Sequence, residues 1–167
     1  KTSEPWPREC VLIYASNMVK HEFLSDYIVK PMMEDCLPKH LRGEAIAAYL
    51  SKQVIHSDGV YLSNRYDQLG EKVLGGSGVV LVEGCSVGIV VEAQGYETRP
   101  VEEPPSENVV RGPRQGFAED LGVNISLVRR RIINLQFKVK FMTVGEQTKT
   151  KVALLYVDGI ASQALLD

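Results

Sequence analysis

The sequence has no long apolar run, few cysteines and no excess of charge of one sign, and each absence excludes a class of protein. None of its 167 residues lie in an apolar run approaching the ~20 residues that a membrane helix needs, and no signal peptide is visible. The formal net charge of −2 gives no global attraction to nucleic acid or to an anionic membrane. An odd number of widely spaced cysteines favours buried thiols in a reducing compartment over a disulfide framework or a metal site: Cys10, Cys36 and Cys85.

Motifs of catalysis and cofactor binding are missing as well. The glycine-rich residues 75–78 precede an expected strand and no Gly-Lys-Ser/Thr follows, so a helix end explains them better than a phosphate-binding loop. Cys85, in an expected hairpin turn, has no neighbouring base that would make it a nucleophile. We therefore expect no metal, no cofactor and no enzyme activity. The three histidines are polar-flanked and have no ligand partner at metal spacing: His21, His40 and His56.

Apolar periodicity predicts an α/β fold, in which a mixed β-sheet is flanked by helices. The length suits one domain, or one domain plus a fragment, and 44% hydrophobic residues are enough for a core. The continuous apolar run 10–15 predicts a strand buried on both faces. Further expected elements are a helix from about Lys20 that Pro31 kinks or restarts, helices over 43–50 and 65–74, a strand beginning at Val54-Ile55, a hairpin of strands 79–83 and 87–93, and a linker over 100–108.

The densest pattern runs from Val109 to Val157. Apolar residues at helical spacing predict a helix of about four turns, with Arg129, Arg130 and Arg131 in its last turn. Strict alternation over Leu135–Phe141 predicts a half-buried strand, and Gly145-Glu146 a turn into a second strand that ends at Val157. The helix is expected to bury Phe117, Leu121, Ile125, Val128 and Ile132.

One internal repeat is visible. Residues 11–19 followed by Phe23-Leu24 align with residues 153–161 followed by Leu165-Leu166, each copy a strand, a turn and a helix start. Two such copies predict two related α/β subdomains, the first over residues 1–147 and the second beginning at 148–167 and truncated after its first helical turn. The alternative is that two buried strands resemble each other by composition alone.

The residues also resemble a known family. Val109-Val-Arg-Gly-Pro-Arg114-Gln-Gly-Phe117, Asn124-Ile-Ser-Leu-Val-Arg-Arg-Arg-Ile132, Thr143-Val-Gly145 and Thr148-Lys-Thr-Lys-Val-Ala-Leu-Leu-Tyr-Val-Asp-Gly-Ile160 are similar to the GerA family of bacterial spore germination proteins. The similarity is to the soluble N-terminal domain of the A-type subunit of germinant receptors, and it reaches back to Leu12-Ile-Tyr14. Within this pattern Gly112, Pro113, Gly116, Asn124 and the three arginines read as the structural motif.

The resemblance implies a place and a set of partners. It implies a domain on the cytosolic (spore core) side of the spore inner membrane, attached through membrane helices that follow it and are absent from this chain. Its partners would be the B-type membrane subunit and the C-type lipoprotein, in an oligomer whose membrane part conducts ions. The domain would then contribute to nutrient sensing, receptor assembly or gating of that channel, rather than to catalysis.

Four residues stand out as candidates for ligand or interface contacts. Arg111 and Arg114 flank a rigid Gly-Pro turn, where guanidinium groups suit a carboxylate of a ligand or partner; a structural ion pair is the alternative. Asp158-Gly159 follows an apolar strand, where open α/β sheets place ligands, although a turn that needs glycine explains it equally well. The three adjacent arginines diverge around the helix, which favours helix-end capping over nucleic-acid contact.

Three other functions stay open from the residues alone. A small-molecule module would hold an amino acid or sugar in a cleft between two lobes. An enzyme of unknown reaction would show a cleft with a perturbed acid–base pair. Nucleic-acid binding through the arginine helix would show a steep salt dependence.

Overall fold

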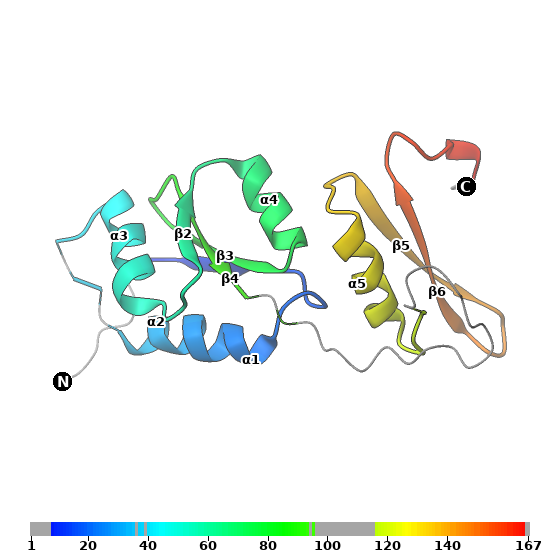
Figure 1. Ribbon diagram of the computed structural model, residues 1–167, viewed down its shortest axis with the longest axis horizontal. Helices are drawn as coiled ribbons and strands as arrows, with labels where there is room; N and C mark the ends of the chain where they lie inside the picture. The colour runs from blue at the N-terminus through cyan, green and yellow to red at the C-terminus, as the bar shows by residue number, and fades with distance from the viewer. Residues whose placement is uncertain (1–7, 36, 39, 94, 96–115, 166–167) are drawn as a thin grey trace, which may run out of the picture. The chain divides into compact units, whose positions relative to one another are not determined.

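The computed structural model describes residues 8–35, 37–38, 40–93, 95 and 116–165 (Figure 1). These residues form two compact units, divided between residues 96 and 97, and each unit is described by itself. Unit 1 comprises β1 (Cys10–Ile13), α1 (His21–Leu24), η1 (Ser25–Val29), α2 (Lys30–Glu34), α3 (Glu44–Tyr49), η2 (Leu50–Val54), β2 (Val60–Ser63), α4 (Tyr66–Leu74), β3 (Ser77–Val82) and β4 (Gly88–Glu92). Unit 2 comprises α5 (Leu121–Arg131), β5 (Phe137–Val144), β6 (Thr150–Val157) and the 3₁₀ turn η3 (Gln163–Leu165).

The sheet of unit 1 has four strands in the order β1-β3-β4-β2. Strands β3 and β4 form the predicted hairpin, with Val80 opposite Ile89, and Gly84 takes the left-handed backbone conformation that its turn needs. The α/β class is confirmed. The expected mixed sheet is antiparallel at every pairing of the described strands.

Both faces of this sheet carry apolar side chains, because alternate residues of a strand point to opposite faces. Val80 and Ile89 belong to the larger core, which α1–α2 and α3–η2 cover. Val79 and Val90 belong to a smaller core on the other face, where they pack with Leu69 of α4. Figure 1 shows α4 on the opposite side of the sheet from α1 and α2. Unit 1 therefore closes a core on both sides of its sheet.

The first strand differs from the prediction. The run 10–15 was expected to be buried on both faces, but β1 pairs only with β3 and lies at the edge of the described sheet. Val11 is 55% exposed and Ile13 41% exposed, while Leu12 packs against the larger core. An apolar run does not distinguish an edge strand from a central one. The sequence reading also missed β2, the other edge, which has only four residues.

Pro31 shapes the helical segment 21–34, as its sequence predicts. Because proline has no backbone N–H, it cannot donate to the carbonyl of Tyr27, four residues earlier. The backbone N–H of His56 donates to this carbonyl instead, at 3.3 Å, and the chain widens into the π-helical turn η1 just before α2. The strand expected from Val54-Ile55 is wrong, since Val54 ends the π-helical turn η2.

Unit 2 contains one helix and one hairpin. Helix α5 begins later than predicted: Asp120 is its N-cap and accepts a hydrogen bond from the N–H of Val123 at 2.8 Å. Phe117, expected on the buried face, precedes the helix and is 75% exposed. Helical spacing extends through Phe117, but the capping carboxylate three positions later sets the start of the helix.

Strands β5 and β6 form the predicted antiparallel hairpin, with Phe137 opposite Val157 and Lys140 opposite Leu154. The boundary expected between residues 147 and 148 falls in the turn of this hairpin, whereas the compact units divide at 96/97. Residues 148–157 therefore belong with β5 in one unit. Among the described residues, no helix has the length and apolar character that crossing a bilayer requires.

Candidate functional site

The Arg-Gly-Pro-Arg segment carries two of the four predicted contact residues. Arg111, Gly112, Pro113 and Arg114 lie outside the described residues, so their role stays a prediction. Gly116, the first described residue after them, is half-buried and precedes the start of α5.

Asn124 ties the segment before α5 to the helix. Its side-chain Oδ1 accepts from the backbone N–H of Ala118 at 2.7 Å, and its Nδ2 donates to the carbonyl of the same residue, also at 2.7 Å. One amide thus satisfies both backbone groups of a residue outside the helix. A carboxylate or an aliphatic side chain cannot make both contacts, which gives Asn124 a structural reason for its place in the motif.

The three arginines end α5, where positive charge opposes the negative end of the helix dipole. The guanidinium of Arg129 lies 5.6 Å from the ring centroid of Phe137, a cation–π contact between the helix and β5. Arg130 is half-buried and Arg131 exposed, so the side chains diverge as the helical period requires. This geometry agrees with the prediction that the arginines interact with the end of the helix. The three guanidinium groups do not line up on one face, as a nucleic-acid contact would require.

Asp158 and Gly159 form a tight turn after β6. The N–H of Asp158 donates to the carbonyl of Gln136 at 2.8 Å, and Gly159 has a φ of +80°, which disfavours any other residue. The turn gives Gly159 a structural reason for its place. A contact of Asp158 or Gly159 with a ligand or a partner stays a prediction.

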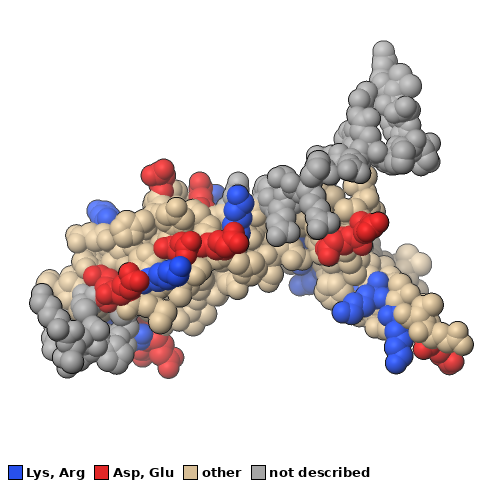
Figure 2. Space-filling view, turned by 90° about the horizontal axis from the view of Figure 1, so that it is seen from below, with Lys and Arg blue, Asp and Glu red and all other residues tan. Residues whose placement is uncertain are grey.

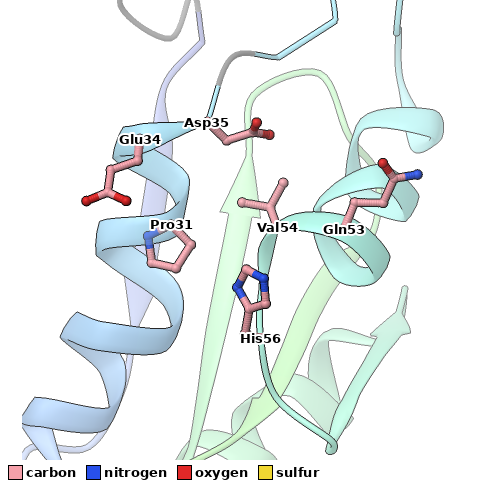
Figure 3. A pocket seen from close by; sticks show the side chains of 6 residues that line it. All are labelled: Pro31, Glu34, Asp35, Gln53, Val54 and His56. Atoms are coloured by element: carbon pink, nitrogen blue, oxygen red, sulfur yellow. The ribbon is translucent and has the colours of Figure 1, made fainter.

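A cavity of about 270 Å³ lies in unit 1, between the ends of α2 and η2 (Figure 3). It is lined by Pro31, Glu34, Asp35, Gln53, Val54 and His56. The hydroxyl of Tyr49 donates to the Asp35 carboxylate at 2.8 Å and fixes its position. Figure 3 shows Val54 and His56 facing the hollow, whereas the Glu34 carboxylate points away from them.

This cavity offers both donors and acceptors of hydrogen bonds. Asp35 supplies a carboxylate, Gln53 an amide and His56 an imidazole, and no lysine or arginine lines the cavity, so its chemistry suits a small polar ligand. Sequence reasoning missed it, because it depends on residues far apart in the chain meeting at two helix ends. The only signal was Pro31, whose missing N–H leaves the Tyr27 carbonyl for His56 and so draws that residue to the helix.

The two described cysteines are held as thiols. Burial raises the pKa of Cys85, and the Sγ–H of this residue donates to the carbonyl of Gly43 at 3.1 Å. Cys10 is exposed at the surface, and partial desolvation of its thiol, with the nearby Cys85 second, raises its pKa. A nucleophilic cysteine needs the opposite shift. Within the residues that the structure describes, no group of three or more His, Cys, Asp or Glu side chains is placed to hold a metal ion.

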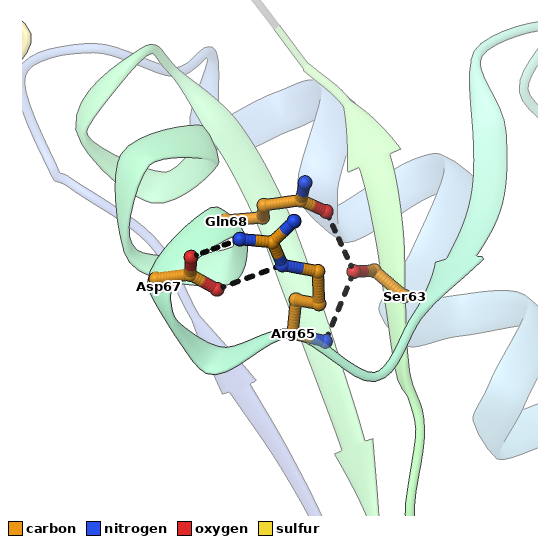
Figure 4. A network of polar contacts seen from close by, with 4 residues as sticks. All are labelled: Ser63, Arg65, Asp67 and Gln68. Atoms are coloured by element: carbon orange, nitrogen blue, oxygen red, sulfur yellow. Dashed lines mark hydrogen bonds and ion pairs between the residues drawn. The ribbon is translucent and has the colours of Figure 1, made fainter.

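A polar network at the start of α4 is a further cluster outside the predicted residues (Figure 4). The guanidinium of Arg65 binds the carboxylate of Asp67 through two nitrogens, at 2.6 and 3.3 Å. Ser63 accepts from the N–H of Arg65 and donates to Gln68. The hydrogen bond from Arg65 lowers the pKa of Asp67. All four residues are half-buried or exposed, so the network is a surface cluster beside the start of α4 rather than an enclosed site.

Comparison with known proteins decides the family. The family model described as "Bacillus/Clostridium GerA spore germination protein" matches residues 3–167. The chain belongs to the GerA family. Among curated GerA relatives from Bacillus subtilis (strain 168), the uncharacterized membrane protein YfkQ is 32% identical over 159 residues and spore germination protein KA is 29% identical over 155 residues. Each alignment covers 93% of this chain, but only 30% and 28% of the respective relatives.

A solved structure shows the same fold. The N-terminal domain of the A subunit of the Bacillus megaterium spore germinant receptor GerK3 matches with a TM-score of 0.68 and 21% sequence identity. The match covers 96% of this GerA-family chain and 56% of the solved chain. The resemblance to the GerA family is therefore confirmed over nearly the whole length, and the fold with it.

Proposed function

We propose that this chain is the N-terminal domain of the A-type subunit of a nutrient germinant receptor, and that it contributes to nutrient sensing, receptor assembly or channel gating. The observation that carries the proposal is the family match over residues 3–167. Support comes from the fold, which is that of the N-terminal domain of a germinant receptor A subunit. The raised pKa values of Cys10 and Cys85 argue against a nucleophilic thiol at these two positions.

The proposed partners follow from the same relationship. The domain would work with a B-type membrane subunit and a C-type lipoprotein, in an oligomeric receptor of the spore inner membrane. Its position would be on the spore-core side, next to the membrane segments of the same A-type subunit. Residues 148–167, together with β5 in the same compact unit, would belong to a second α/β subdomain that is related to the first by the strand–turn–helix repeat.

A direct test uses Arg114. In the complete receptor, Arg114→Ala should leave the domain folded and abolish or slow germination, measured as the fall in optical density of a spore suspension after nutrient is added. The matched variant Arg114→Lys keeps the charge but loses the two-pronged guanidinium, so partial activity would identify bidentate carboxylate binding. A normal germination rate with Arg114→Ala, or an isolated domain that melts well below the parent, would contradict this role.

The second candidate is a small-molecule binding module, and the cavity between α2 and η2 favours it. NMR titration of the chain with a panel of amino acids, sugars and nucleosides distinguishes the two. Saturable shifts at His56 and Gln53 would make the domain a direct sensor. No shift across the panel, with the protein folded, would place the nutrient site outside this chain and leave assembly and gating as its role.

A further inference from the structure

The cavity between α2 and η2 is bordered by two contacts that hold its walls in place. The Tyr49 hydroxyl donates to the Asp35 carboxylate at 2.8 Å and joins α3 to the end of α2. The backbone N–H of His56 donates to the carbonyl of Tyr27 at 3.3 Å. Figure 3 shows Asp35 and His56 toward opposite ends of the hollow. Because the protein itself makes both contacts, the cavity is formed before any ligand enters, and binding costs less ordering entropy.

The helical turn η2 widens beside this cavity without a proline to cause it. The N–H of Ile55 donates to the carbonyl of Leu50, five residues earlier, at 2.9 Å and closes a π-helical turn. Pro31 accounts for the π-helical turn η1, but residues 50–56 contain no proline. Single π-helical turns occur frequently at functional sites. The turn carries Gln53 and Val54, so the irregular backbone and the cavity coincide.

The lining of the cavity combines polar groups with two apolar side chains. The Asp35 carboxylate accepts hydrogen bonds, the Gln53 amide donates and accepts them, and the neutral form of the His56 imidazole does both as well. Pro31 and Val54 supply apolar surface. A hydroxyl group both donates and accepts, so a ring that carries several hydroxyls can satisfy the three polar side chains while its C–H groups pack on the apolar ones.

The same lining disfavours an anionic ligand. Among the described residues no lysine or arginine lines the cavity, so a carboxylate or phosphate would leave water without a cationic partner. The Asp35 carboxylate would also repel it. The α-carboxylate of an amino acid meets the same penalty, whereas a neutral ligand avoids it. The volume of about 270 Å³ restricts the ligand to a small molecule, since pockets for drug-sized ligands begin at ~300 Å³.

We propose that this cavity binds a small neutral polyhydroxy compound, of the class of monosaccharides and cyclitols. Its hydroxyls would meet Asp35, Gln53 and His56, and its C–H face would lie on Pro31 and Val54. This inference rests on the second candidate function, the small-molecule binding module, and names the class of its ligand. The role of the chain in a receptor is tested separately in spores, through Arg114, and does not depend on this cavity.

The experiment is an NMR titration of the 167-residue chain with probes that share one ring, glucose and glucuronate. Glucose should give saturable shifts at Gln53 and His56. Glucuronate should bind roughly tenfold more weakly or worse, because its carboxylate finds no cationic partner in the lining. Glucosamine is the third probe, and it replaces one hydroxyl by an ammonium group. If glucosamine bound more than roughly tenfold tighter than glucose, the site would select a cation and the proposal would be overturned.

Two variants and one control connect the binding to the lining. Gln53→Leu removes the amide and should weaken glucose binding by roughly two- to tenfold. The matched control is Lys52→Leu, an exposed neighbour in the same helical turn that does not line the cavity, and it should leave the affinity unchanged. Asp35→Asn keeps an acceptor for the Tyr49 hydroxyl but removes the negative charge, so it should narrow the difference between glucose and glucuronate.

The outcomes separate the class of ligand from the existence of a site. No saturable shift with glucose, glucuronate binding as tightly as glucose, or equal weakening by Gln53→Leu and Lys52→Leu would each overturn the proposal. If an amino acid or a nucleoside instead shifted Gln53 and His56, the cavity would stand as a binding site and only the class of ligand would be wrong. Silence of every compound, with the chain folded, would overturn the binding module together with its ligand.

Discussion

Unit 1 and unit 2 use the same kinds of element, yet among the described residues only unit 1 closes a hydrophobic core. Its four strands carry helices on both faces, and residues such as Ile46, Leu50 and Ile89 have no exposed surface. In the described part of unit 2, one helix meets a two-stranded sheet, and only Ile125, Ser126 and Phe137 are buried. The comparison indicates that closing a hydrophobic core depends on covering both faces of a sheet.

The two units also differ in charge. Described residues 8–95 carry more acidic than basic side chains, while residues 116–165 carry seven basic and four acidic ones. In Figure 2, red acidic side chains are spread over the visible face of unit 1, and blue basic side chains follow the visible side of the hairpin. The modest net charge of the whole chain therefore hides two units of opposite sign. Each unit has to be considered separately when partners are sought.

The largest loss of stability should come from a substitution that leaves a cavity in the core of unit 1. Ile46→Ala removes a side chain with no exposed surface and should lower the free energy of unfolding by about 2–5 kcal/mol. Leu154→Ala, at a half-buried position of unit 2, should cost far less. Chemical denaturation followed by NMR signals of each unit measures both. Equal losses at the two positions would contradict the difference in closure.

A smaller loss of stability is expected when the hydrogen bonds between Asn124 and Ala118 in unit 2 are removed. Asn124→Ala removes two hydrogen bonds to Ala118 and should destabilise unit 2 by about 1–3 kcal/mol. Asn124→Asp keeps the acceptor but not the donor, so its loss should be intermediate. Hydrogen exchange in α5 is the measurement. If the amide hydrogens of α5 exchange at the same rate in both variants as in the parent, the Asn124 side chain does not hold the segment before the helix in place.

Deprotonation of the two described cysteines should lower the stability of unit 1, which contains both of them. Burial raises the pKa of Cys85 and Cys10 above the ordinary 9.0, so the folded state favours the neutral thiol. The resulting stabilisation is complete below about pH 9 and is lost as the pH rises through the raised pKa. Denaturation midpoints between about pH 7 and 11 should fall more steeply for the parent than for the double variant Cys10→Ser, Cys85→Ser. If the denaturation midpoints of the parent and the double variant fall equally with pH, the cysteines do not cause the loss of stability.

The smallest effect should come from the exposed network at α4. Arg65→Ala and Asp67→Ala break an ion pair that lies in solvent, and such pairs contribute little. We expect no measurable change in the denaturation midpoint of unit 1, and no salt dependence beyond that of the parent. A clear loss for both variants would mean that the start of α4 depends on this pair.

Sequence reasoning succeeded where a local rule decides the structure. Gly84 and Gly145 mark the two hairpin turns, and both have the positive φ that their neighbours could not adopt easily. Pro31 marks the irregular helix for an equally local reason, its missing N–H. The GerA resemblance rested on motifs that lie mostly in unit 2, and the family match confirms it over both units.

Sequence reasoning failed where the structure depends on residues that are far apart in the chain. Cys10–Ile13 has the composition of a central strand, and only the strand order makes it an edge. Phe117 fits the helical period, but the Asp120 cap and the Asn124 tie place it outside the helix. Sequence reasoning missed the cavity at His56, for which Pro31 was the only signal, since the cavity forms where two helix ends meet.

Hydrogen exchange of the parent chain, followed by mass spectrometry, tests the difference in core closure between the two units most directly. We expect β3 and β4 to exchange far more slowly than β5 and β6, because helices cover both faces of the sheet that holds β3 and β4. Exchange of β5 and β6 as slow as that of β3 and β4 would contradict the account.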